Sequence, residues 1–397
     1  MNLTDPLFLN PQAVLTILIA IIFYAIGWNE SIRRAVLLFF SFYFYFKFAG
    51  LIELGVVISL SLVTFFCGLS KKNKLISLAI VINLGTLVIA KYQLASFGTS
   101  VWIPLGISFF VFEFIHYLVE IKRGMEPEKV FRQFLTFSFF FPTVVSGPIR
   151  RYREFADQTS SLKRITSDNL MLGMSLISLG FVYKFGADQF ANFQDKMNYY
   201  GVYSGALGGV IFLFVISMRI FLDFAGYSYI AIGISRIVGI RIPQNFNAPY
   251  LSTSIIDFWN RWHISLSNWV RDYLFIPLGG SRVHFLRNIV NLMISMAVIG
   301  LWHGFGARFL VWGLLQGLGL SINHAFRRLT KGRVNPGKTK FQSLASWIIT
   351  MLFVSCSWVF FFYDPDKALT IIGSILFGTL PPEASNYIRI LLNGVLP

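Results

Sequence analysis

The sequence has 397 residues, of which 55% are apolar and 17% aromatic, while only 13% are charged. Soluble domains contain about 25% charged residues, so this composition excludes a string of soluble domains and indicates one polytopic, all-α membrane domain over residues 1–397. The net charge of +16 does not indicate nucleic-acid binding, because the basic residues stand in short clusters between apolar segments, as in cytoplasmic loops.

Membrane spans are expected wherever roughly 20 mainly apolar residues follow one another. The first apolar stretch lacks the basic region and cleavage site of a secretory signal, so we expect a retained first span. Basic clusters at Arg33-Arg34 and at Lys71–Lys74 place two loops in the cytoplasm. About eleven spans are expected, at roughly 11–28, 35–50, 51–69, 75–92, 101–121, 168–186, 204–225, 287–303, 306–326, 343–363 and 385–397.

Two regions are interrupted by prolines and charges and do not fit a straight span. Residues 134–155 have an apolar part of only about 15 residues, broken by Pro142, Gly147 and Pro148. Residues 241–286 hold three prolines, several tryptophans and many charges. Irregular backbone at membrane depth is tolerated only where protein or a water-filled cavity surrounds it. We therefore expect short re-entrant segments in both regions.

His303 stands at the end of an apolar run that begins at Ile289 and has no charged residue. An ionisable side chain at membrane depth is costly, so it is expected to face the protein interior or a polar cavity and to mark a functional site. The alternative is a structural histidine that is hydrogen-bonded between helices. Glycines at small-xxx-small spacing, Gly300 with Gly304 and Gly313 with Gly317, predict close helix contact beside it.

A second histidine, His263, lies in the polar and aromatic stretch "FWNRWHISLSNWVRDYLFIPLGG" at 258–280. If this stretch is a helix, Asn260, His263 and Ser267 share one face and form one wall of a wet cavity. The other side would show Trp259, Trp262 and Leu266. The alternative is an interfacial amphipathic helix whose aromatic residues anchor it at the headgroup level.

Histidine has an unperturbed pKa of about 6.5, so it takes a proton from a hydroxyl near neutral pH and returns it to a leaving group. Other chemistries are poorly supported. The sequence has no complete G-x-S-x-G elbow, P-loop or dinucleotide fingerprint. The histidines lack zinc-site spacing, so no metal is expected. Cys67 and Cys356 lie in apolar runs and are expected to be packing residues.

Two carboxylates, Glu113 and Asp223, stand inside apolar runs and are expected to be buried. A buried charge needs a partner, so we expect both to pair with a cation such as Arg219 or Lys184. His116 lies one turn from Glu113 and is expected to bond it.

Five segments carry a further pattern: "GISFFVFEFIHYLVEIKRG", "FFPTVVSGPIRRYREF", "FLDFAGYSYIAIG", "PQNFNAPYLSTSIIDFWNRWHISLSNWVRDYLFIPLGG" and "GLWHGFGARFLVWGLLQGLGL". Together they resemble the membrane-bound O-acyltransferases, in the bacterial branch that contains alginate O-acetyltransferase and the D-alanyl transfer protein of teichoic acid synthesis. The resemblance covers residues 100–325, and the order of the "RWH…S" and "WHG" blocks is specific to that family.

The resemblance implies a multi-helix fold with two re-entrant segments around a central tunnel that joins the two faces. It implies that His303 is the catalytic base and that His263 occupies the asparagine-or-histidine position of the earlier block. Asn260, Ser267 and Trp302 are expected to contact substrate. "RDYLFIPLGGSR" looks like the acetylase type, whereas "PTVVSGPI" and the short chain look like the D-alanyl type.

We therefore expect a multi-pass O-acyltransferase of the bacterial inner membrane. It would move an acyl group, acetyl in the first instance, from a cytoplasmic thioester donor to hydroxyls of an extracytoplasmic polysaccharide or to a periplasmic partner. The resemblance implies acetyl-CoA as an acetyl donor, or the acylated phosphopantetheine of a carrier protein as a D-alanyl donor, with no tightly bound cofactor. The expected partners are membrane lipid, the polysaccharide acceptor, and a periplasmic acyltransferase or a cytoplasmic acyl-carrier protein.

Two other classes of protein remain as alternatives. A transporter of a lipid-linked or acyl-bearing species would also use broken segments near mid-membrane, but transporters commonly show two related halves and no such repeat is visible. A purely structural membrane subunit is the other alternative, and the two histidine blocks argue against it.

Overall fold

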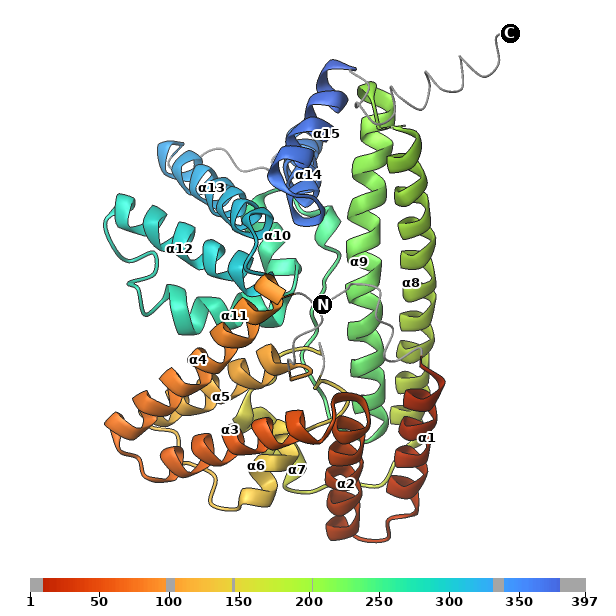
Figure 1. Ribbon diagram of the computed structural model, residues 1–397, viewed down its shortest axis with the longest axis vertical. Coiled ribbons are helices and arrows are strands. Elements are labelled where there is room, and N and C mark those ends of the chain that lie inside the picture. Colours follow the sequence, from red (N-terminus) through yellow and green to blue (C-terminus); the bar gives the residue numbers. More distant parts are fainter. Residues whose placement is uncertain (1–9, 98–103, 145–146, 202, 331–338, 379–397) are drawn as a thin grey trace. The chain divides into compact units, whose positions relative to one another are not determined.

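The computed structural model describes residues 10–97, 104–144, 147–201, 203–330 and 339–378, and all regular secondary structure in these ranges is helical (Figure 1). The expected all-α architecture is therefore confirmed. The helices of thirteen residues or more are α1 (Pro11–Ile26), α2 (Glu30–Ala49), α3 (Leu51–Leu69), α4 (Asn73–Phe97), α5 (Ile107–Lys122), α8 (Ser167–Tyr200), α9 (Gly205–Ile237), α12 (Phe285–His303), α13 (Ala307–Leu329), α14 (Lys340–Phe362) and α15 (Pro365–Phe377). The short elements are α6 (Phe131–Ser138), α7 (Tyr152–Thr159), the 3-10 turn η3 (Pro249–Leu251), α10 (Ile255–Arg261), α11 (Ile264–Val270) and the π-helical turn η4 (Arg271–Phe275).

Seven of the described helices are long and apolar enough to cross a bilayer, namely α3, α4, α8, α9, α12, α13 and α14. Each lies where a span is expected, so the multi-pass membrane fold is confirmed. Among the other expected spans, α1 and α5 have only 16 residues each, and α2 carries charged residues near both ends. The expected span at 385–397 lies outside the described residues.

The chain forms two compact units. Unit 1 comprises Met1–Val182, Ala225–Asn245 and Ile264–Tyr273, and unit 2 comprises Tyr183–Phe224, Phe246–His263 and Leu274–Pro397. The helices α8 and α9 each contribute residues to both units. The single domain expected over residues 1–397 stays a prediction.

Unit 1 contains the first of the two broken segments. The helix α6 ends at Ser138, and the chain then passes through turns and extended backbone before α7 begins at Tyr152. Residues 136–144 and 147–150 are all buried, as irregular backbone must be if it lies at membrane depth. The expected interruption around Pro142 is confirmed, and its position in the membrane stays a prediction.

A buried ion pair joins α5 to the end of this segment. Glu113 accepts hydrogen bonds from Arg150 Nε at 3.0 Å and from Arg150 Nη2 at 2.8 Å, and the two side chains are 5% and 3% exposed. The Arg150 guanidinium also lies over the rings of Phe137 and Phe155. Glu113 is buried as expected. Its partner is Arg150 of the neighbouring broken segment, so the expected partners Arg219 and Lys184 are wrong for Glu113.

In unit 2, α12 and α13 cross at glycines. A Cβ on Gly300 would lie 2.2 Å from the carbonyl oxygen of Phe309, and a Cβ on Gly313 would lie 2.4 Å from the carbonyl oxygen of Met296. Neither distance leaves room for a side chain. The close contact expected from the glycine spacing is therefore confirmed.

Unit 2 also holds the second expected buried carboxylate. Asp223 of α9 pairs with Lys184 of α8, which confirms one of the expected partners. Both side chains are largely shielded from solvent, at 13% and 8% exposure. The attraction between the two charges offsets part of the cost of burying them.

Candidate active site

His303 ends α12 and lies among aromatic rings of unit 2. Its ring centroid is 4.6 Å from that of Trp302, 5.0 Å from Phe361 and 5.4 Å from Trp312, with all three rings edge-on. The ring of Phe309 stacks on it at 6.2 Å. We call these four rings the aromatic cage. The imidazole is partly exposed within the cage, so a reacting group can approach it.

The glycine crossing of α12 with α13 builds one side of this cage. Because Gly300 and Gly313 have no side chains, the first turn of α13 approaches the last turn of α12 closely enough for Phe309 and Trp312 to reach His303. Gly304 serves the same purpose, since a Cβ there would lie 2.5 Å from the Phe309 ring.

His263 occupies a strained position between α10 and α11. Its φ of +42° lies in the left-handed region, which side-chain-bearing residues rarely adopt. The imidazole is 2% exposed and packs edge-on against Phe224 at 4.5 Å. Its Nε2 is buried and has no hydrogen-bond partner among the described residues. Burial lowers the pKa of His263, so the imidazole is neutral near pH 7.

Trp302 links the two histidines. Its ring centroid is 6.0 Å from that of His263 and 4.6 Å from that of His303. Two histidines 40 positions apart in the sequence therefore meet the same indole ring within unit 2. The tertiary structure places His263, Trp302 and His303 in one cluster, and their chemical roles stay predictions.

The expected polar stripe of Asn260, His263 and Ser267 is wrong as a helix face. The chain does not form one helix here, because α10 ends at Arg261 and α11 begins at Ile264. The positive φ of His263 redirects the chain between them. Asn260 is exposed while His263 is buried, and Ser267 belongs to unit 1.

The residues expected on the apolar side of this stretch are buried. Trp259 donates a hydrogen bond from Nε1 to Gln316 Oε1 at 3.1 Å, and Gln316 donates from Nε2 to Ser357 Oγ at 2.6 Å. Gln316 is fully buried in α13 and was missed by the sequence reasoning. A glutamine inside an apolar helix was the signal, because an amide at membrane depth needs partners.

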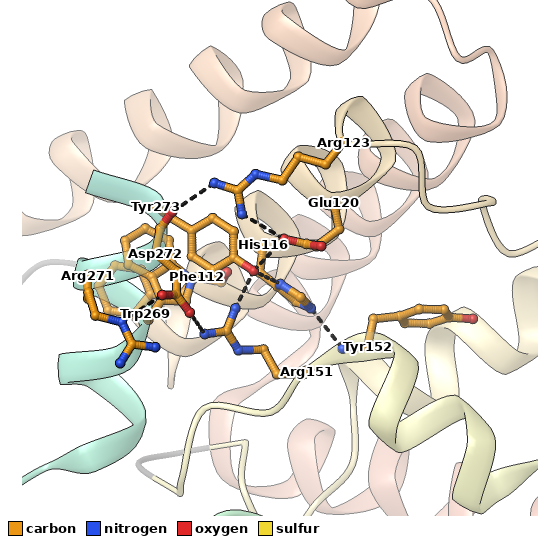
Figure 2. Close-up of polar contacts among 10 residues, drawn as sticks. All are labelled: Phe112, His116, Glu120, Arg123, Arg151, Tyr152, Trp269, Arg271, Asp272 and Tyr273. Carbon is orange, nitrogen blue, oxygen red and sulfur yellow. Dashed lines mark hydrogen bonds and ion pairs between the residues drawn. The ribbon is translucent and has the colours of Figure 1, made fainter. Parts of the chain in front are cut away.

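A second polar cluster, also missed, lies in unit 1 around the hydroxyl of Tyr273 in η4 (Figure 2). This hydroxyl lies 2.6 Å from Nδ1 of His116, accepts a hydrogen bond from Arg151, and donates to Glu120 Oε1 at 2.9 Å. His116 therefore bonds Tyr273, and the expected bond to Glu113 is wrong, because Arg150 already holds that carboxylate. The sequence offers only the consecutive polar residues Arg271, Asp272 and Tyr273 as a sign of this cluster, and they do not identify its partners.

Arginines surround this hydroxyl (Figure 2). Arg151 pairs with Asp272 at 2.6 Å, and Arg271 pairs with the same carboxylate at 2.8 Å. Burial favours a higher pKa for Asp272, but the hydrogen bonds and charges of Arg271 and Arg151 outweigh it and lower the pKa below its usual range. The carboxylate thus stays ionised and holds two arginines at η4.

No group of three histidine, cysteine or carboxylate side chains suited to a metal ion occurs in the described ranges. The chemistry that the histidine cluster can perform is acid–base catalysis by imidazole, since histidine is the side chain that titrates nearest to neutral pH.

These observations define a class of protein, a polytopic α-helical membrane protein with two buried or caged histidines beside a glycine-packed helix pair. Residues 129–363 match the model of MBOAT, the membrane-bound O-acyltransferase family. The chain belongs to this family and is an O-acyltransferase. The matched segment contains His263, Trp302 and His303.

Curated relatives agree with this assignment. A protein named "Probable alginate O-acetylase AlgI" from Azotobacter vinelandii is 32% identical over 356 residues, which cover 83% of this chain and 69% of the relative. The teichoic acid D-alanyltransferase of Bacillus subtilis is 33% identical over 272 residues, which cover 66% of this chain and 69% of the relative. The peptidoglycan O-acetyltransferase of Helicobacter pylori is 33% identical over 296 residues, with 65% and 54% covered.

Proposed function

We propose that this O-acyltransferase moves an acetyl group from a cytoplasmic thioester, acetyl-CoA, to hydroxyls of an envelope polysaccharide on the other side of the bacterial inner membrane. A periplasmic acyltransferase that receives the group and passes it on is an alternative acceptor. The observation that carries the proposal is the meeting of His263 and His303 around Trp302, inside the segment that matches the family.

His303 acts as the general base in this proposal. Its imidazole removes the proton from the acceptor hydroxyl while the hydroxyl oxygen bonds to the thioester carbonyl carbon. The resulting tetrahedral intermediate carries its negative charge on the former carbonyl oxygen. Collapse of the intermediate breaks the carbon–sulfur bond, and the imidazolium returns the proton to the departing thiolate. The products are an ester and a free thiol.

His263 positions a reactant or supports the charged intermediate. A neutral imidazole with hydrogen on Nε2 would donate to the developing oxyanion, and with hydrogen on Nδ1 it would accept from the acceptor hydroxyl. The buried Nε2, which lacks a partner in the described part of the chain, suits either use, since an unsatisfied buried polar atom is costly without a ligand. Asn260 and Trp302, which belong to the same unit as the two histidines, remain proposed substrate-binding residues, and the role expected for Ser267 of unit 1 stays a prediction.

Transfer of D-alanine to a teichoic-acid-type polymer is the second candidate. It is favoured by the alignment with the Bacillus subtilis D-alanyltransferase, which reaches 69% of that protein. The donor would then be the phosphopantetheine thioester of a cytoplasmic carrier protein. Family membership favours either transferase over the transporter and the structural subunit.

The test measures transfer of labelled acetyl from acetyl-CoA in proteoliposomes that contain the full chain and a polysaccharide acceptor. We expect His303→Ala to lower the transfer rate by at least about 10²-fold, the usual contribution of a general base. The matched control is His324→Ala, which changes a histidine of the neighbouring helix α13 and should transfer like wild type. Equal transfer by His303→Ala and wild type would refute the role of His303. Transfer from a D-alanyl carrier protein but not from acetyl-CoA would favour the second candidate.

A further inference from the structure

A cluster of polar side chains in unit 2 lies apart from the two histidines, where α8, α9 and α14 meet. Gln194 accepts a hydrogen bond from Arg219 Nη1 at 2.9 Å and donates one to the Tyr363 hydroxyl at 2.7 Å. Asn198 donates a second hydrogen bond to the same hydroxyl at 2.7 Å. We call Gln194, Asn198, Arg219 and Tyr363 the distal polar cluster.

This cluster has hydrogen-bonding capacity beyond its internal bonds. The Tyr363 oxygen accepts from two amides, so its own hydrogen is available to an outside acceptor. The buried Oδ1 of Asn198 has no hydrogen-bond partner among the described residues. Arg219 uses one of its N–H groups on Gln194 within that part of the chain. The cluster therefore offers donors, an acceptor and a positive charge.

The distal polar cluster adjoins the aromatic cage through three consecutive residues of the α14 end. Phe361 packs on His303 at 5.0 Å, and the guanidinium of Arg219 lies over the ring of Phe362 at 5.1 Å. Tyr363 follows directly. A ligand held by the cluster would thus lie next to the histidine that we propose as the base.

A second arginine contacts the same end of α14. Arg308, in the first turn of α13, donates from Nη1 to the carbonyl oxygen of Phe362 at 3.2 Å. Its guanidinium also lies over the Phe309 ring at 4.5 Å, and that ring stacks on His303. Phe362 is thus contacted by Arg219 at its ring and by Arg308 at its carbonyl oxygen. Neither forms a salt bridge within the described ranges.

The described acidic groups nearby do not form salt bridges with these two arginines. Asp223, whose carboxylate interacts with Arg219 over a longer distance, is already paired with Lys184. Asp195 and Lys367 lie near Tyr363 and have opposite charges. Asp364 and Asp366 begin α15 directly after Tyr363, but neither they nor any other described carboxylate forms a salt bridge with Arg219 or Arg308. Both guanidinium groups therefore keep N–H donors for an outside anion.

The helix ends place this site on the extracytoplasmic side. Arg327 and Arg328 end α13, Arg287 lies in the first turn of α12, and further basic residues follow up to Lys340, where α14 begins. Positive residues mark cytoplasmic ends. His303, Arg308 and Phe362 occupy the opposite ends of the same three helices.

We propose that the distal polar cluster and Arg308 bind the acceptor, and that this acceptor is an anionic, hydroxyl-rich polymer. Arg219 and Arg308 bind a carboxylate or phosphate of one repeating unit. The Tyr363 hydroxyl and Asn198 Oδ1 bind hydroxyls of its neighbour, so that a further hydroxyl reaches His303. This inference rests on the proposed function, because it assumes that His303 activates an acceptor hydroxyl.

The test measures binding of fluorescent oligomers to the full chain in nanodiscs by anisotropy, without an acyl donor. The probes are a polymannuronate oligomer, a poly(glycerol phosphate) oligomer and a neutral mannan oligomer of equal length. We expect at least one anionic oligomer to bind about 10-fold more tightly than the neutral one, with affinity that falls as salt rises. The tighter anionic probe identifies carboxylate or phosphate as the ligand. Equal binding of the neutral oligomer, or no binding of any oligomer, would overturn the proposal.

Matched variants locate the binding. Arg219→Gln and Arg308→Gln should each raise the Kd for the anionic oligomer by about 10-fold, and Tyr363→Phe should raise it by about 3-fold. Arg328→Gln is the control, since this arginine also lies over a ring, that of Phe285, at the other end of α13. If Arg328→Gln weakens binding as much as Arg308→Gln, the site is refuted. Arg219→Lys, which keeps the charge, should recover part of the affinity, and Arg308→Gln carries the test if Arg219→Gln does not fold.

A second readout separates this inference from the proposed function. Transfer of acetyl from acetyl-CoA to glycerol, a small neutral hydroxyl compound, should be unchanged in the control Arg328→Gln and abolished in His303→Ala. If wild type binds the anionic oligomer in the expected pattern but transfers no acetyl, the proposed function fails and the binding site stands. If transfer to glycerol is normal and the oligomer pattern is absent, the binding site fails alone.

Discussion

Nδ1 of His116 lies 2.6 Å from the hydroxyl of Tyr273, and the backbone N–H of Tyr152 donates to Nε2 of the same imidazole at 2.8 Å. Because Nε2 accepts this hydrogen bond, the hydrogen of the neutral ring is on Nδ1 and is donated to Tyr273. The Tyr273 hydroxyl therefore donates to Glu120. One imidazole thus ties α5 to both the start of α7 and the π-helical turn η4, which directly follows α11.

Removal of the Tyr273 hydroxyl is expected to destabilise unit 1. Tyr273→Phe leaves the Nδ1–H of His116 and one Arg151 donor without their acceptor, which should lower the free energy of unfolding by about 1–3 kcal/mol. The measurement is the thermal midpoint of the detergent-solubilised protein. Tyr92→Phe, at a tyrosine that is 61% exposed in α4, is the control and should change nothing. A midpoint equal to wild type for Tyr273→Phe would show that the network has no stabilising role.

The Glu113–Arg150 pair should behave as a buried charge pair. Glu113→Gln leaves the buried guanidinium of Arg150 uncompensated, so the free energy of unfolding should fall by about 3–5 kcal/mol. The double variant Glu113→Leu/Arg150→Met should lose less than the sum of the losses of the two single variants. Double-mutant-cycle unfolding measures this coupling. The exposed pair Lys71–Glu126 is the comparison, and Glu126→Gln should have no measurable effect. Additive single changes at Glu113 and Arg150 would contradict the expectation.

The crossing of α12 with α13 should not tolerate a methyl group. Gly300→Ala places Cβ 2.2 Å from a backbone oxygen, so the helices must separate, at a cost of about 1–3 kcal/mol, and the rings around His303 must move. We expect a lower thermal midpoint together with reduced acyl transfer. Gly85→Ala is the matched change, because a Cβ at this glycine of α4 meets no atom within 4 Å and alanine is the better helix former. Normal activity in Gly300→Ala would show that the close crossing is dispensable.

The two roles of His263, backbone and imidazole, can be separated by substitution. His263→Gly removes the ring but relieves the strain of the positive φ, so this variant should be more stable than His263→Ala. Transfer should fall by about 10²-fold in both variants, as for loss of a group that supports the charged intermediate. Thermal midpoints and initial rates of acetyl transfer are measured side by side. If His263→Gly transfers like wild type, the imidazole is not part of the site.

The spans and the catalytic candidates show how far sequence reasoning reaches. The seven helices that qualify as spans were all expected, because the thickness of the bilayer sets the length of the apolar run that a spanning helix needs. The glycine spacing correctly predicted the close contact of α12 with α13. By contrast, the helical stripe through Asn260 and Ser267 failed, since periodicity assumes continuous helical backbone, and Trp262 and His263 both depart from it.

Partner choice was the other point at which sequence reasoning failed. Glu113 and His116 lie one turn apart in α5, which made a bond between them the local expectation, yet each bonds a residue far away in the chain. Local spacing says which side chains share a face, but which cation or hydroxyl meets that face depends on how the broken segment before α7 and the turn η4 pack.

The sequence by itself determined that this is a helical membrane protein, which segments are apolar enough to span, and that two histidine motifs lie in a family-specific order, because hydrophobicity, spacing and motif identity are properties of the chain. Only the tertiary structure decided that Trp302 contacts both His263 and His303, that Arg150 pairs with Glu113, and that Arg219 and Arg308 meet at Phe362. Such contacts join residues distant in sequence, and they depend on packing geometry, which no local pattern encodes.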